Sequence, residues 1–110
     1  MEKIIRELYE NVYSMKIGYL YYQSRKNLKE IEKIVPDIKE FVLWFLEENR
    51  FGVEENFYHD MCNNLIQILQ DIIVAMEQED HVLLHDAVAY GFIDYLEIFI
   101  PEEEIKYGNV

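Results

Sequence analysis

The chain has 110 residues, of which 51% are hydrophobic, and it carries a formal net charge of −12 at pH 7. This length and apolar content predict a single folded domain with its own hydrophobic core, and they exclude a disordered tail. The excess of acidic residues argues against nucleic acids and anionic membranes as partners, because the phosphates of both would be repelled.

The charge is unevenly distributed along the chain. Residues 1–50 contain nine basic and nine acidic residues, whereas residues 51–110 contain thirteen acidic residues and a single basic one, Lys106. An acidic surface of this kind suits a basic protein partner, whose association it would accelerate by electrostatic steering.

The sequence predicts neither a membrane span, nor a signal peptide, nor an internal disulfide. Its longest apolar run, Phe41–Leu46, is far shorter than the ~20 residues of a spanning helix. The N-terminal residues Met1–Glu7 mix acids with bases and lack a cleavage-site pattern. Cys62 is the one cysteine, which fits a reducing compartment. We therefore predict a soluble cytoplasmic protein.

Apolar residues recur at intervals of three and four throughout the chain, which predicts an all-α fold. A first helix is expected from about Glu2 to Tyr22, followed by a turn at Gln23–Arg25, with the alternative that the helix runs on into Lys26. The apolar stripe of this helix comprises Ile5, Leu8, Val12, Met15, Tyr19 and Tyr22.

A second helix is predicted from Leu28 to about Asn49, and Pro36 interrupts its apolar pattern. Proline inside a helix removes a hydrogen bond and clashes with the preceding turn. We therefore expect a kink or a short break near Val35, with the helix restarting at Pro36. Gly52 is expected just beyond the end of this helix, as part of its C-cap.

A third helix is predicted from near Val53 to near Glu77, and a fourth begins after Asp80, a residue suited to capping a helix N-terminus. Pro101 is expected to end the fourth helix, and residues 101–110 to form a frayed tail. Four helices joined by short loops predict an antiparallel up-down four-helix bundle, with residues 1–110 as one domain.

His81 and His85 lie one helical turn apart, which places two imidazoles on one face near Glu77, Glu79 and Asp80. This arrangement supports the hypothesis of a metal-binding bundle, in which a neighbouring carboxylate would complete the site. The residue after His81 is not the glutamate that metalloproteases require, and no third ligand is specified. The alternative is that both are surface or helix-cap histidines, and we assign no metal ligands.

The sequence contains no pattern that predicts an enzyme. His59 and Cys62 are three residues apart and could meet on a helix, but no oxyanion-stabilising loop accompanies them. A half-buried structural cysteine is the favoured interpretation. Phosphate-binding loops, dinucleotide-binding glycines and paired cysteines are also absent. We therefore predict no catalytic residue and no cofactor.

The run Phe41–Leu46 allows two interpretations, because six successive apolar residues cover every face of a helix. The helix is either central and enclosed by the other three, or part of it forms an exposed aromatic patch of the kind that marks binding sites. On the second interpretation we predict interface residues around the second loop, namely Phe41, Trp44, Phe51 and Phe57.

Two short motifs resemble an uncharacterised family of small acidic helical proteins of low-GC bacteria, a domain of unknown function. Asp80–Asp86 reads D-x-V-L-L-x-D, and Val35–Ile38 reads hydrophobic-Pro-Asp-hydrophobic. The chain departs from the family at Gly91 and Ile93, where an acid and a proline are frequent, so its backbone is expected to differ there. A bacterial origin also fits the 47 residues with A/T-rich codons (Phe, Tyr, Met, Ile, Asn, Lys), against 12 with G/C-rich codons. The resemblance implies an all-helical domain and supplies no activity.

These observations favour a non-enzymatic protein–protein interaction module that binds a partner protein or itself as a homo-oligomer. Two alternatives stay open. One is the metal-binding bundle that uses His81 and His85, and the other is an export-chaperone-like protein, which rests on size, acidity and helicity alone.

Overall fold

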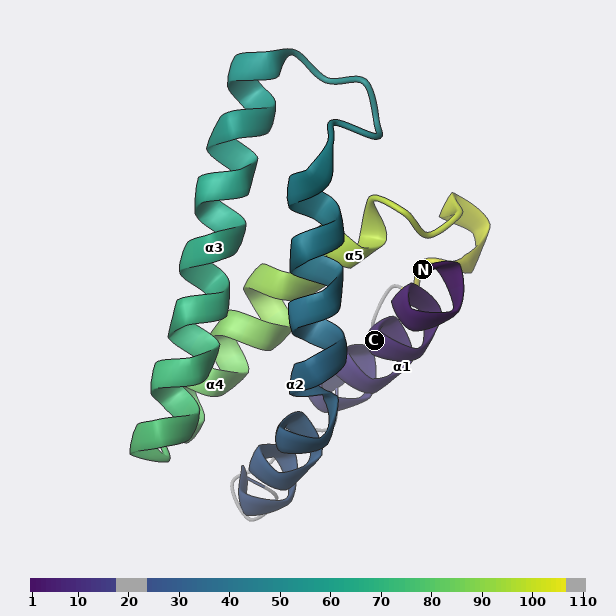
Figure 1. Cartoon of the computed structure of the whole chain (residues 1–110). Helices are drawn as coiled ribbons and strands as arrows, with labels where there is room; N and C mark the ends of the chain where they lie inside the picture. The colour runs from purple at the N-terminus through teal and green to yellow at the C-terminus, as the bar shows by residue number, and fades with distance from the viewer. Residues whose placement is uncertain (18–23, 107–110) are drawn as a thin grey trace.

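The computed structural model describes residues 1–17 and 24–106, which are helical over most of their length (Figure 1). No strand occurs in these two ranges, so the predicted all-α class is confirmed. The elements are α1 (Glu2–Ile17), α2 (Ser24–Glu47), α3 (Glu55–Gln78), α4 (His81–Asp86), the π-helical segment η2 (Ala87–Phe92), α5 (Ile93–Glu97) and the 3-10 turn η3 (Glu102–Glu104).

The segments α4, η2 and α5 follow one another without interruption and act as one fourth helix. Figure 1 shows α2 and α3 side by side and antiparallel, with the fourth helix passing behind α2 at an oblique angle. α1 packs against α2, η2 and α5. The predicted four-helix bundle is therefore confirmed.

The first predicted turn is wrong in part. Ser24 and Arg25 belong to α2, because neither residue breaks a helix and no glycine or proline lies between Gly18 and Pro36. Gln23, and the predicted extension of the first helix from residue 18 to Tyr22, lie outside the described residues.

Pro36 lies inside α2 without interrupting it, so the kink is confirmed but the break is not. Figure 1 shows the axis of α2 changing direction between its N-terminal and C-terminal parts. Proline bends the helix because its ring clashes with the preceding turn. Ile31, Ile38 and Phe41, on either side of Pro36, are completely buried and hold both parts of the helix in the core.

The hydrophobic core draws on all four helices, and every buried residue within 1–16 and 29–106, where side-chain burial is described, is apolar or a tyrosine. Burial of this kind is the main favourable term in folding, with each large apolar side chain contributing about 1.5–3 kcal/mol. The largest fully buried side chains are those of Leu8, Val12, Ile31, Ile38, Phe41, Phe45, Leu65, Ile72, Leu84, Phe92, Ile93 and Leu96.

The loop between α2 and α3 is fixed by side-chain hydrogen bonds. α2 ends at Glu47, two residues before the predicted end near Asn49. The Asn49 side chain accepts a hydrogen bond from the Val53 N–H at 3.3 Å and donates one to the Val53 carbonyl. Gly52 adopts a φ of 69°, a left-handed conformation that favours glycine. α3 consequently begins at Glu55, slightly later than predicted.

The junction between α3 and α4 confirms the predicted helix cap. Glu79 takes a left-handed conformation with φ 53°, and the next N–H, that of Asp80, donates to the carbonyl of Ala75 at 2.8 Å. The Asp80 carboxylate then accepts a hydrogen bond from the Leu83 N–H at 3.0 Å. This tight turn places α4 directly against α3.

The segment that follows the fourth helix packs back onto α1, although the sequence predicts a frayed tail. Glu104 forms an ion pair with Arg6, and Lys106 forms one with Glu10. The Lys106 N–H also donates to the Tyr9 hydroxyl at 2.7 Å. Residues 107–110 lie outside the described residues.

Candidate binding groove

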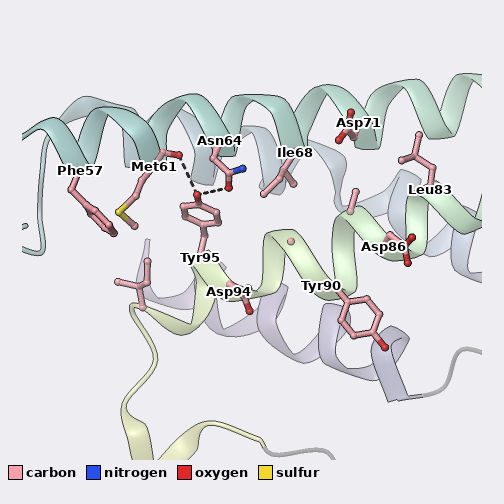
Figure 2. Close-up of a pocket in the computed structure, with 13 residues that line it drawn as sticks. Phe57, Met61, Asn64, Ile68, Asp71, Leu83, Asp86, Tyr90, Asp94 and Tyr95 are labelled. Carbon is pink, nitrogen blue, oxygen red and sulfur yellow. Dashed lines mark hydrogen bonds between the residues drawn. The ribbon is translucent and has the colours of Figure 1, made fainter.

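A groove of about 580 Å³ lies between α3 and the fourth helix. Figure 2 shows α3 along one wall and the α4–η2–α5 helix along the other. Phe57 lies toward one end of the groove, and Leu83 toward the other. Its side chains thus come from two helices that are consecutive in the chain.

The α3 wall is a second stripe of residues beside the core stripe. Phe57, Met61, Asn64, Ile68 and Asp71 recur at intervals of four, three, four and three, so they share one helix face. The buried stripe runs next to it and comprises Tyr58, Leu65, Ile68, Ile72 and Ala75. α3 therefore faces both the core and the groove.

Gly91 lets the two walls approach each other at the groove floor. A Cβ atom added at Gly91 would lie 3.2 Å from Cδ1 of Ile68, closer than ordinary van der Waals contact. Gly91 lies within the π-helical segment η2, and the sequence pattern did not predict this wider turn. Single π-helical turns inside α-helices occur frequently at functional sites.

Tyr95 fixes α5 against α3 at the centre of the groove. Its hydroxyl lies 2.6 Å from Oδ1 of Asn64 and 3.2 Å from the carbonyl oxygen of Met61, so it donates one proton shared between two acceptors (Figure 2). Burial raises the pKa of Tyr95, and the neighbouring Cys62 and Asp94 side chains add to this effect. The hydroxyl therefore stays a donor at neutral pH.

Three carboxylates line the groove, one on the α3 wall and two on the opposite wall. Asp71 accepts a hydrogen bond from the Gln67 amide at 3.0 Å, and Asp86 and Asp94 project from the fourth helix. Among the side chains that the structure describes, those of residues 1–16 and 29–106, no lysine or arginine lines the groove and none pairs with these three carboxylates.

Large apolar side chains are exposed along the same groove. Phe57 is 57% exposed, Tyr90 is 60% exposed and Ile98 is 40% exposed. The Tyr90 ring meets the edge of His85, with ring centroids 5.5 Å apart, and the Lys16 ammonium lies 5.3 Å from the ring centroid. Exposed apolar groups beside a hollow are typical of interaction sites.

The structure separates the four predicted interface residues. Phe41 is completely buried, so its assignment to a surface patch is corrected: it lies in the core, in edge-to-face contact with Phe92 and Phe99. Trp44 and Phe51 are half-buried and pack against the core, whereas Phe57 lines the groove. For Trp44, Phe51 and Phe57, a role in an interface stays a prediction.

The run Phe41–Leu46 is mostly core. Phe41, Val42 and Phe45 are buried, and Leu43 is 66% exposed. The Trp44 ring contacts Phe99 edge-to-face, with centroids 4.9 Å apart, and the Arg50 guanidinium lies over the Trp44 ring, 4.4 Å from its centroid. Arg50 in the α2–α3 loop and Phe99 after α5 therefore both contact Trp44, which is half-buried.

His81 and His85 are both partly buried at the start of the fourth helix. Burial lowers the pKa of His85, an effect that the adjacent Asp86 partly offsets, so this imidazole is neutral at pH 7. In the part of the chain that the structure describes, no three His, Cys, Asp or Glu side chains are grouped closely enough to hold a metal ion. The metal-binding hypothesis therefore stays a prediction with two imidazoles and no third ligand.

His59 and Cys62 have different partners. The His59 imidazole lies 3.5 Å from a carboxylate oxygen of Glu55 and is largely exposed. Cys62 is half-buried and interacts with Tyr58, whose pKa is raised to about 12 by burial and by the hydrogen bond with Cys62.

The sequence pattern predicted contacts around the second loop and did not assign four of the groove residues to a binding site. Gly91, Asp86 and Asp94 lie on one wall and Asp71 on the other. The regular spacing from Phe57 to Asp71 was a usable signal, but the pattern does not specify which helix lies opposite.

No protein-family model, no curated protein and no solved structure matches this chain. The resemblance to a family of small acidic helical proteins and the export-chaperone alternative therefore both stay predictions. No helix among the described residues is long and apolar enough to span a membrane.

Proposed function

We propose that the protein is a non-enzymatic interaction module that binds a partner protein in the groove between α3 and the fourth helix. The observation that carries this proposal is the exposure of Phe57, Tyr90 and Ile98 along a groove of about 580 Å³. Binding would remove this apolar surface from water, at about 25 cal/mol per Å². We also place the protein in the cytoplasm, because its single cysteine fits a reducing compartment.

The acidity of the groove favours a different protein over a second copy of this chain. A symmetric dimer through the groove would bring Asp71, Asp86 and Asp94 of one copy against the same residues of the other. Like charges held together in this way oppose association. Self-association is the competing form of the proposal, and light scattering at several concentrations distinguishes the two.

The proposal is tested by affinity capture from the source cell with the wild-type chain and two alanine variants. Phe57→Ala removes a groove residue, and Leu43→Ala removes an exposed side chain of similar accessibility on α2, outside the groove. Neither side chain is in the core, so both variants should keep the helical circular-dichroism spectrum of the wild type. We expect Phe57→Ala to lose the captured partner and Leu43→Ala to retain it. Equal capture by both variants would refute a function at the groove.

A further inference from the structure

The length of the groove and its two helical walls indicate what kind of segment it would bind. Its α3 wall from Phe57 to Asp71 spans ~21 Å at about 1.5 Å per residue. This length matches a helix of about four turns lying along α3 and the fourth helix. Amphipathic helices bind in such grooves through apolar residues spaced at i, i+3 or i+4, and i+7.

The aspartates along the groove indicate which charges the bound segment carries beside its apolar stripe. Asp71 borders the groove on α3, and Asp86 and Asp94 border it on the other side, so acidic groups flank an apolar floor (Figure 2). Lys106, the one basic residue of the second half, is already paired with Glu10 on α1. The Lys16 ammonium lies 5.3 Å from the ring centroid of Tyr90, a residue that lines the groove.

We infer that the groove binds a helix-forming segment of a partner protein that carries an apolar stripe with Lys or Arg on both sides of it. This inference rests on the proposed function and adds the chemistry of the partner. The apolar stripe would contact Ile68, Phe57 and Ile98, and the basic flanks would meet the three aspartates. Electrostatic steering by the acidic surface speeds the encounter, and added salt weakens it.

The test uses the full chain labelled with ¹⁵N and a synthetic peptide of about 14 residues, the length that fits the groove. The peptide has a leucine stripe flanked by lysines. One control peptide has the same composition in a scrambled order without an apolar stripe, and a second replaces each lysine by glutamate. Chemical-shift changes map the binding site, and circular dichroism of the mixture reports helix formation by the peptide.

We expect the amphipathic basic peptide to shift the resonances of α3 and the fourth helix that border the groove and to become helical. The double variant Asp86→Asn/Asp94→Asn should weaken binding about fivefold, a size typical of partly exposed ion pairs. The matched control Glu102→Gln/Glu103→Gln changes the net charge equally but lies in η3, outside the groove, and should bind as the wild type does.

Three results would overturn the inference. They are equal binding of the scrambled peptide, equal weakening by both double variants, and binding of the peptide without helix formation. If light scattering shows a dimer and Phe57→Ala abolishes that dimer, the groove binds a second copy of this chain. That result would also overturn the inference. If the peptide fails but partner capture still depends on Phe57, the partner chemistry is wrong and the proposed function stands.

Discussion

At the residue scale, Tyr58 joins the start of α3 to the end of α2. Its side chain is buried, and its hydroxyl donates a hydrogen bond of 2.5 Å to the carbonyl of Phe45, in the last turn of α2. The last carbonyls of a helix have no partner within the helix, so this hydroxyl satisfies one of them. Phe45 in turn stacks on the Tyr58 ring, with centroids 5.8 Å apart.

We predict that Tyr58→Phe lowers the free energy of unfolding by about 1 kcal/mol at pH 8, the typical net value of one hydrogen bond. The folded state raises the pKa of Tyr58 to about 12, above its usual value of 10.0. The stability that this hydroxyl contributes is therefore present below pH 10 and is lost as the pH rises toward about 12.

Urea unfolding of the wild type and of Tyr58→Phe across the alkaline range checks this prediction. The difference between the two proteins should shrink as the pH rises. A difference that stays constant up to about pH 12 would show that Tyr58 ionises as readily in the fold as in the unfolded chain.

At the element scale, the fourth helix packs closely on α3 because its π-helical segment places Gly91 over Ile68. Alanine at position 91 would gain up to ~1 kcal/mol of helix propensity over glycine. Its Cβ would lie 3.2 Å from Cδ1 of Ile68, so this side chain must shift. The two effects oppose each other, which makes the contact suited to a double-mutant cycle.

We predict that Gly91→Ala is more favourable in the Ile68→Val background than in the wild type. Valine lacks Cδ1, the atom nearest to the added methyl group, and Ile68→Val alone should cost about 0.5–1.5 kcal/mol. The free energies of unfolding of the two single variants and the double variant give the coupling energy. If the effects of the two substitutions on the free energy of unfolding were strictly additive, the prediction would be wrong, and residues 68 and 91 would not be in tight contact.

The interior of α2 shows where a local rule is overridden by packing. Pro36 predicts a kink or a short break, and the helix bends but continues because the buried residues on both sides hold it in one core. The cap at Asp80 is the opposite case, since the side chain bonds to the N–H of Leu83, only three residues ahead. A local interaction of this kind was predictable from the sequence alone.

At the scale of the whole molecule, the acidic side chains of residues 51–110 repel one another in the folded state. The net charge of −12 arises in residues 51–110, where the acids of α3 and the fourth helix lie on adjacent helices. We predict that raising NaCl from about 0.02 M to about 0.5 M increases the midpoint of thermal unfolding, because salt screens the repulsion.

The variant Asp86→Asn/Asp94→Asn removes two of these charges from the groove and should show a smaller salt dependence than the wild type. Glu102→Gln/Glu103→Gln, in η3, serves as the comparison for an equal change in net charge. A midpoint that falls with added NaCl in the wild type would contradict the repulsion and would indicate that ion pairs dominate.

The aromatic residues show why the candidate site was only partly predictable. The run Phe41–Leu46 is apolar on every face, so its spacing could not indicate that Phe41 is buried and Leu43 exposed. Phe57 was predicted as a surface contact and does line the groove. The sequence did not assign Asp86, Asp94 and Gly91 to a binding site, because their place in the groove depends on α3 lying opposite.

The sequence by itself determined the all-α class, the capped turn at Asp80 and the separation of charge between the two halves. Each of these follows from interactions between residues close in the chain, or from composition. Only the tertiary structure decided that Phe41 is core, that the helix continues through Pro36, and that an apolar groove lies between α3 and the fourth helix with three aspartates along it. The reason is that burial and groove formation depend on which helix faces meet, and residues far apart in the sequence set that pairing.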